Sequence, residues 1–133
     1  MEAGGYAQLL REAYKSAAGM PEVTRALAVE AAAGKALGAL RAAPLPAHRQ
    51  AVAGAPKAAL PRLRLAEALL GVGQAEEALE MGLEAMRLSR GQAELAQVGE
   101  DARSAVLACF EILGDRHPAT GPGRKALTRL LFK

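Results

Sequence analysis

Few side chains in this sequence have the types and spacing that catalysis or metal binding requires. The two histidines, His48 and His117, each stand near a proline in a segment expected to be a loop, and neither has a histidine or cysteine at metal-ligand spacing. The one cysteine, Cys109, permits no internal disulfide and no C-x-x-C redox pair. We therefore expect surface histidines, a buried structural thiol, and no catalytic residue, metal or cofactor.

Two further motifs have simpler interpretations than a site. Gly71-Val72-Gly73 lacks the preceding strand that a phosphate loop requires, so it is predicted to be a turn. Four glutamates at helical spacing predict a solvated helix face, with docking of a basic partner as the alternative: Glu76, Glu77, Glu80 and Glu84. No Ser-His-Asp or Cys-His grouping is indicated. An enzyme is therefore disfavoured, and binding is the leading functional class.

The composition favours an all-α fold. Hydrophobic residues make up 51% of the 133 residues, many of them alanine, and aromatic residues only 3%. Alanine is the best helix former, and no alternating β-branched run suggests a sheet. No apolar stretch is long enough for a membrane span, and charged residues at the N-terminus argue against a secretory signal. We expect a cytoplasmic protein, or one of an organelle matrix or stroma if a targeting segment has been removed.

The charge pattern gives no nucleic-acid footprint. The 17 basic and 14 acidic residues are spread along the chain and leave a net charge of +3. Basic residues outnumber acidic ones locally only near the C-terminus. An ordinary solvated surface is the simpler interpretation of that excess, and a phosphate-binding patch is the alternative.

A helix hairpin from Leu60 to Leu88 organises the chain. Apolar residues recur at three and four residues on both sides of a turn at Gly71-Val72-Gly73-Gln74, which predicts two antiparallel helices. Ala66, Ala78 and Ala85 are twelve and seven apart. That is the spacing of small residues in a tetratricopeptide repeat, where it lets two helices approach closely. The hairpin therefore resembles that repeat, although Arg62 stands where a large aromatic is common.

Further helices are predicted on both sides of the hairpin. They are expected over 3–18, from Pro21 to Pro44 and over 47–53, then over 100–113 after an irregular segment at 92–99, and finally over 124–132. Gly121-Pro122-Gly123 is predicted to form a poorly helical corner. We expect one domain of six to seven helices in a short solenoid, with an N-terminal pair (1–45), a tetratricopeptide-like core (46–90) and a C-terminal pair (91–133).

The run from His48 onward carries a more specific pattern. A helix that ends in Cys109-Phe110-Glu-Ile-Leu113-Gly114 is followed by Gly123-Arg124-Lys-Ala-Leu127-Thr-Arg-Leu130-Leu131-Phe132. With the hairpin before it, this run resembles the C-terminal helical region of the YbbN (CnoX) thioredoxin-like co-chaperones. The positions that match the family pattern are Ala66, Ala78, Ala85, Phe110, Leu113, Gly114, Arg124, Leu127, Leu131 and Phe132.

The resemblance implies a protein-interaction module, the helical part of a co-chaperone or holdase. Its implied partners are a GroEL-type chaperonin, a DnaK-type chaperone or unfolded clients. Family members carry a thioredoxin-fold domain ahead of these helices and this chain carries none, so it is an excised region or a stand-alone descendant. The alternative function is a non-catalytic scaffold subunit of a larger, possibly organellar, assembly.

Two candidate surfaces for a partner follow. The first is the last helix, with an apolar anchor flanked by basic residues: Arg124, Lys125, Leu127, Arg129, Leu130, Leu131 and Phe132. A helix that only caps the end of the solenoid is the competing interpretation. The second surface is the concave face of the hairpin, with Leu63, Glu67 and Leu70. There the alternative is that the two leucines only pack on the adjacent repeat.

Overall fold

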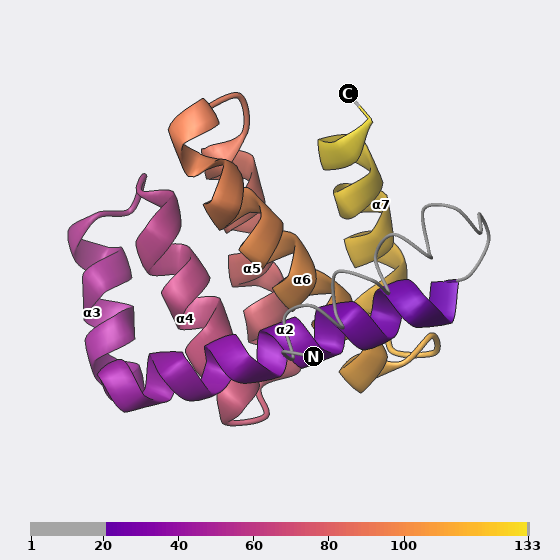
Figure 1. Cartoon of the computed structure of the whole chain (residues 1–133), viewed down its shortest axis with the longest axis horizontal. Helices are drawn as coiled ribbons and strands as arrows, with labels where there is room; N and C mark the ends of the chain where they lie inside the picture. The colour runs from indigo at the N-terminus through magenta and orange to yellow at the C-terminus, as the bar shows by residue number, and fades with distance from the viewer. Residues whose placement is uncertain (1–20, 133) are drawn as a thin grey trace, which may run out of the picture.

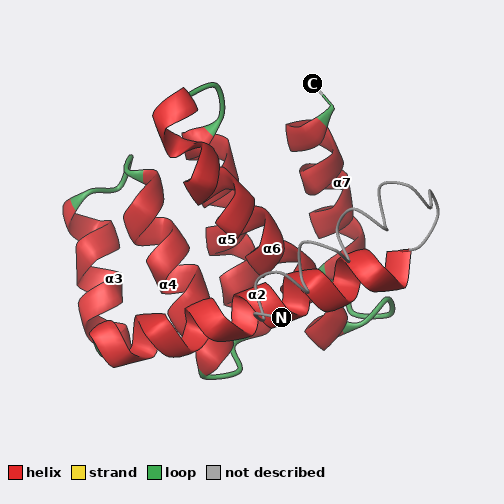
Figure 2. Cartoon of the chain, in the orientation of Figure 1, coloured by secondary structure: helices red, strands yellow, loops and turns green. Residues whose placement is uncertain are grey.

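The computed structural model describes residues 21–132, with side chains from residue 29 onward. Six α-helices and one 3₁₀ helix make up the described chain, which contains no strand (Figure 2). They are α2 (Pro21–Ala42), α3 (Leu45–Gly54), α4 (Ala59–Gly71), α5 (Ala75–Ser89), η1 (Ala93–Leu95), α6 (Ala96–Leu113) and α7 (Thr120–Leu131). The all-α prediction is confirmed. The helix predicted over 3–18 lies outside the described residues.

The predicted hairpin is present as α4 and α5, which stand side by side in Figure 1. Its turn contains Gly73 with φ of 82°, a left-handed conformation that glycine adopts at little cost. Small residues lie where the two helices meet, since Ala66 and Ala78 are both fully buried. Arg62, at the position of the usual aromatic, instead donates two hydrogen bonds to the Pro56 carbonyl, at 3.2 and 3.0 Å.

Helix α6 continues the layer, packing extensively on α5. It begins at Ala96 rather than near Glu100, because the 3₁₀ turn η1 leads directly into it. The approach of α5 to α6 is close at Gly82, where an added Cβ would lie 2.8 Å from Val106 Cγ2. The core runs along this seam and includes Leu69, Leu79, Val106, Cys109 and Phe110.

The prediction of a non-helical corner at Gly121-Pro122-Gly123 is wrong. These residues form the first turn of α7, which begins at Thr120. Proline is tolerated there because the first turn of a helix has no acceptor for the backbone N–H that proline lacks. The side chain of Thr120 is fully buried and donates a hydrogen bond to the Gly114 carbonyl at 2.7 Å, which fixes the connection from α6.

Helix α2 is one continuous helix, as predicted, and runs across α4 and α6 rather than beside them (Figure 1). It buries alanines, namely Ala32, Ala36 and Ala39. Its larger apolar residues Val29 and Leu37 are 40% and 56% exposed. An alanine-rich helix has no dominant apolar face, so the tightness of its approach decides which side is buried.

His48 corrects a second expectation. It lies in α3, not in a loop, and is buried. Its Nε2 is 2.9 Å from the Ala39 carbonyl, to which it can donate a hydrogen bond. The helix begins at Leu45, before the predicted start at 47, because Pro46 occupies its first turn instead of preceding it. His48 thus ties α3 to the end of α2. His117 lies in the turn before α7, where its Nδ1 accepts a hydrogen bond from the Ala119 N–H at 3.0 Å.

Candidate protein-binding surfaces

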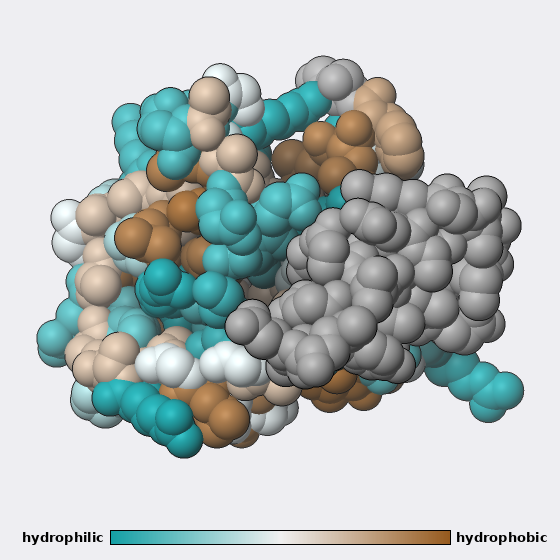
Figure 3. Space-filling model, viewed as in Figure 1, coloured by the Kyte–Doolittle hydropathy of each residue, from teal (hydrophilic) through white to brown (hydrophobic). Residues whose placement is uncertain are grey.

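The last helix divides into a buried side and an exposed side. Leu127 is buried in the core and Leu130 is partly buried against it. Leu131 and Phe132 are 40% and 83% exposed, and hydrophobic atoms gather at this end of α7 in Figure 3. Arg124, Lys125 and Arg129 are also exposed. The predicted anchor is therefore shared between the core and the surface.

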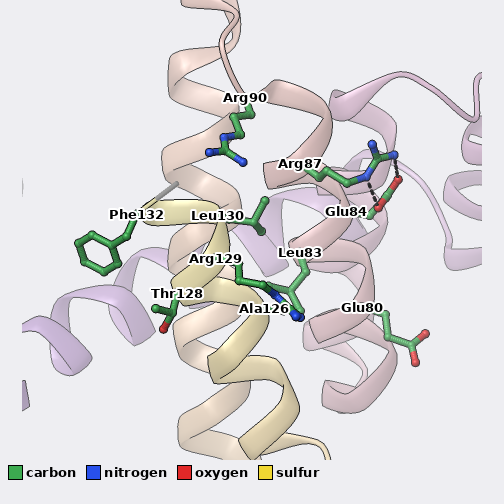
Figure 4. A pocket seen from close by; sticks show the side chains of 10 residues that line it. All are labelled: Glu80, Leu83, Glu84, Arg87, Arg90, Ala126, Thr128, Arg129, Leu130 and Phe132. Carbon is green, nitrogen blue, oxygen red and sulfur yellow. Dashed lines mark hydrogen bonds and ion pairs between the residues drawn. The ribbon is translucent and has the colours of Figure 1, made fainter.

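A groove separates α7 from α5 and encloses about 980 Å³ (Figure 4). Leu130 points from α7 toward α5, while the ring of Phe132 projects away from both helices (Figure 4). The groove can form because α7 packs on α5 less extensively than α4 or α6 does. The residues that line it are Glu80, Leu83, Glu84, Arg87, Arg90, Ala126, Thr128, Arg129, Leu130 and Phe132.

Ion pairs already occupy several charged groups around α7. Arg87 makes a bidentate pair with Glu84 on the groove wall, and this pair lowers the pKa of the Glu84 carboxyl. Arg124 pairs with Asp115 and lies 5.7 Å from the centre of the Phe110 ring. Arg124 therefore has a structural role at the base of α7. Of the predicted basic residues, only Arg129 lines the groove.

The predicted concave-face residues are not on an open face, and two of them, Glu67 and Leu70, lie beside α2. Leu63 and Glu67 are each 1% exposed, and Leu70 is partly buried. Glu67 Oε1 accepts a hydrogen bond from Arg64 Nη1 at 2.8 Å, whereas its Oε2 is buried without a hydrogen-bond partner in the described chain. Burial raises the pKa of the Glu67 carboxyl. The structure therefore does not bring these residues together with the α7 surface.

The charged groups around Glu67 were not predicted from the sequence. Lys35 Nζ on α2 is 3.6 Å from Asp101 Oδ2 on α6, and both groups influence the charge state of Glu67. Gln97 Nε2 donates to the other oxygen of Asp101 at 2.8 Å. This cluster forms because α2 crosses α4 and α6, and the sequence gives no signal of that crossing. Leu83, on the wall of the α5–α7 groove, was also missed, although its place in the α5 apolar pattern was visible.

The groups that the sequence suggested for chemistry are separated, paired or buried in the described residues. No group of three or more histidine, cysteine, aspartate or glutamate side chains in this part of the chain could hold a metal ion. Cys109 is fully buried, and desolvation raises the pKa of its thiol to about 12. The predicted face of four glutamates on α5 is partly neutralised, because Arg49 on α3 forms a bidentate ion pair with one of them, Glu77. None of the described helices has both the length and the apolar content that a membrane span needs.

Comparison with known proteins agrees with this architecture. A family model described as tetratricopeptide repeat matches residues 38–132, which extends from the end of α2 through α7. No curated protein and no solved structure gives a significant match.

Proposed function

Because the chain belongs to the tetratricopeptide repeat family, whose members mediate protein–protein interactions, we propose that it is the helical part of a thioredoxin-like co-chaperone or holdase. Its partners in this proposal are a GroEL-type chaperonin, a DnaK-type chaperone or unfolded client proteins. The resemblance of residues 48–132 to the YbbN (CnoX) helical region supports this assignment. The family match by itself supports only the coarser statement, a protein-binding domain.

The observation that carries the proposal is the end of α7. Phe132 is the most exposed large hydrophobic residue of the described chain, at 83%. It stands at the rim of the α5–α7 groove, with Leu83 and Leu130 inside and Arg129 beside it. An exposed aromatic next to an apolar groove is the usual form of a protein-binding anchor. A short apolar segment of a partner would fill the groove and cover the ring.

A permanent scaffold subunit is the second candidate. Exposed apolar side chains also occur away from α7, since Leu37 on α2 and Ile112 on α6 are 56% and 58% exposed. A subunit of a larger assembly would bury several exposed apolar patches at once, whereas a transient co-chaperone needs only one apolar binding patch.

Co-purification distinguishes the two candidates. The chain carrying an affinity tag is recovered from cells with and without ATP depletion, and its partners are quantified by mass spectrometry. The co-chaperone proposal predicts substoichiometric chaperone whose recovery changes with nucleotide. A fixed set of partners at constant stoichiometry, unaffected by nucleotide, would support the scaffold instead.

A matched pair of variants links the result to α7. Phe132→Ala should reduce chaperone recovery, whereas Ile112→Ala should not, because Ile112 is an exposed apolar residue outside the α5–α7 groove. Both substitutions remove exposed side chains, so neither should alter folding.

A further inference from the structure

An apolar pocket lies where α2 crosses the end of α4 and α6 (Figure 1). It encloses about 280 Å³, and its larger lining residues are Val29, Leu37, Leu70 and Ile112. Val29, Leu37 and Ile112 are 40%, 56% and 58% exposed, so three of the exposed large hydrophobic residues of the described chain gather at one place. Exposed apolar side chains gathered in this way mark a surface that another element covers.

The size and chemistry of this pocket favour protein side chains over a small ligand. Its volume is just below the roughly 300–1,000 Å³ that is typical of small-molecule sites. Its lining offers no polar side chain that could orient a ligand. A few apolar side chains on one side of a helix would fill it.

The sequence places a segment of matching chemistry directly before α2. Residues 1–20 precede α2 and lie outside the described residues. Over 3–18, apolar residues recur at three and four residues, with both tyrosines of the chain among them: Tyr6, Leu9, Leu10, Ala13, Tyr14 and Ala17. The intervening residues are polar, namely Gln8, Arg11, Glu12 and Lys15. This pattern predicts a helix whose apolar side requires a partner.

The length of the connection brings this segment to the pocket. Only residues 19–20 separate the predicted helix from α2, and a connection of about two residues joins helices that lie antiparallel. At about 1.5 Å per residue, Val29 and Leu37 lie about 12 and 24 Å from the start of α2. Leu10 and Tyr6 lie about 12 and 18 Å back from the end of the predicted helix. Both therefore fall beside the part of α2 that lines the pocket.

We propose that residues 3–18 form a helix antiparallel to α2, and that Tyr6 and Leu10 occupy the pocket between Val29 and Leu37. The pocket is then an internal docking site for this segment of the chain. It shares no lining residue with the α5–α7 groove, so the inference goes beyond the proposed function and does not depend on it. Leu37, whose exposure favours the scaffold candidate, is in this proposal covered by the chain itself.

Thiol labelling of a cysteine placed in the pocket tests the proposal in the full chain. Ala33 lines the pocket and is exposed among the described helices, so Ala33→Cys puts a small reactive group there. A docked segment would shield this thiol from a maleimide reagent. Adding Leu10→Asp should speed the labelling roughly tenfold, because a buried carboxylate opposes docking and the open form becomes populated. Gln8→Asp adds the same charge on the polar side of the predicted helix and should leave the labelling slow.

Cys109 reports on folding in the same samples, because it is fully buried and should stay unlabelled while the helices remain packed. The milder Tyr6→Ala should speed the labelling of Ala33→Cys severalfold, and it decides the matter if Leu10→Asp exposes Cys109. The proposal is overturned if Leu10→Asp and Gln8→Asp label at equal rates with Cys109 protected, or if Tyr6→Ala changes nothing. It is also overturned if dilution alone makes the labelling fast, since a second copy of the chain is then the occupant.

Discussion

Glu67 is a charged side chain whose burial could not be predicted from its position in the sequence. Helical spacing assigns it to an outer face of the hairpin, yet the structure buries it under α2 beside Asp101 and Lys35. Desolvation is the largest influence on its pKa and raises it, while the hydrogen bond from Arg64 opposes that rise. The protonation of this one carboxyl therefore affects how stably α2 is held.

The pH dependence of stability should reveal this carboxyl. Because the pKa of Glu67 is raised above its ordinary 4.5, the folded state holds the proton more tightly than the unfolded state does. The free energy of unfolding therefore falls as pH rises from about 4.5 through the raised value. Glu67→Gln removes that decline, so we expect the variant to gain stability relative to the unmodified chain toward pH 7 in urea titrations.

Glu77→Gln is the matched control of opposite sign. The hydrogen bond from Arg49 lowers the pKa of Glu77, so its contribution is present above the ordinary 4.5 and is lost as pH falls below it. That variant should be less stable than the unmodified chain at pH 7 and should match it in acid. Parallel pH profiles for Glu67→Gln and Glu77→Gln would contradict both assignments.

Cys109 gives a second prediction at the residue scale. With the pKa of its thiol raised to about 12, the folded chain holds almost no thiolate at pH 8. We expect iodoacetamide to label Cys109 only as fast as the chain unfolds, and completely in guanidinium chloride. Stability should also decline as pH rises from the ordinary 9.0 toward 12. Rapid labelling of the folded chain would show that the thiol is accessible.

At the scale of elements, one helix glycine lies at a close crossing and another lies on an exposed side. Gly82 lies where α5 meets α6, and its missing Cβ leaves room for Val106. Gly38 on α2 is exposed, with no atom within 4 Å of where its Cβ would be. The same substitution should therefore have opposite effects at the two positions.

We expect Gly82→Ala to lower the free energy of unfolding by ~1–3 kcal/mol, because the stiff Val106 side chain cannot move aside easily. Gly38→Ala should raise it by ~0.5–1 kcal/mol, because alanine loses less backbone freedom in a helix. Urea unfolding of both variants measures the difference. Stabilisation by Gly82→Ala would mean that α5 and α6 are further apart than described.

The first turn of α7 offers a similar comparison. An added Cβ at Gly123 would be 2.8 Å from Phe110 Cε1 and 3.0 Å from Leu79 Cδ2, whereas Gly121 has no such neighbour. Gly123→Ala should push α7 away from α5 and α6 and lower the melting temperature by a few degrees. Gly121→Ala should leave it unchanged or raise it. Equal melting temperatures for the two variants would contradict the described packing of α7.

The elements that the sequence predicts well are those with local signals. The α4–α5 hairpin was predicted because Gly71 and Gly73 mark its turn and small residues mark its crossing. The start of α7 was predicted too late, since a proline between two glycines indicates a corner unless it falls in a first turn. The buried side of α2 was not predicted, because alanine-rich helices bury whichever side fits most closely. Long-range fit of this kind leaves no periodic signal in the sequence.

For the whole molecule, the described helices form one layered array with a groove between α5 and α7 and a buried polar cluster beneath α2. The residues predicted for partner binding are divided between them, with Phe132, Leu130 and Arg129 at the α5–α7 groove and Glu67 beneath α2. The sequence pattern suggested the first of them through the anchor in α7. It could not indicate that α2 buries Glu67, because that depends on how three separate helices meet.

The central claim is that α7 and its groove bind a chaperone partner. Its most direct test is a titration of purified GroEL-type chaperonin with fluorescently labelled chain, followed by anisotropy. We predict saturable binding that Phe132→Ala weakens roughly tenfold, about 1.4 kcal/mol, and that Ile112→Ala leaves unchanged. The claim is contradicted if the unmodified chain shows no saturable binding, or if the two variants bind as tightly as each other.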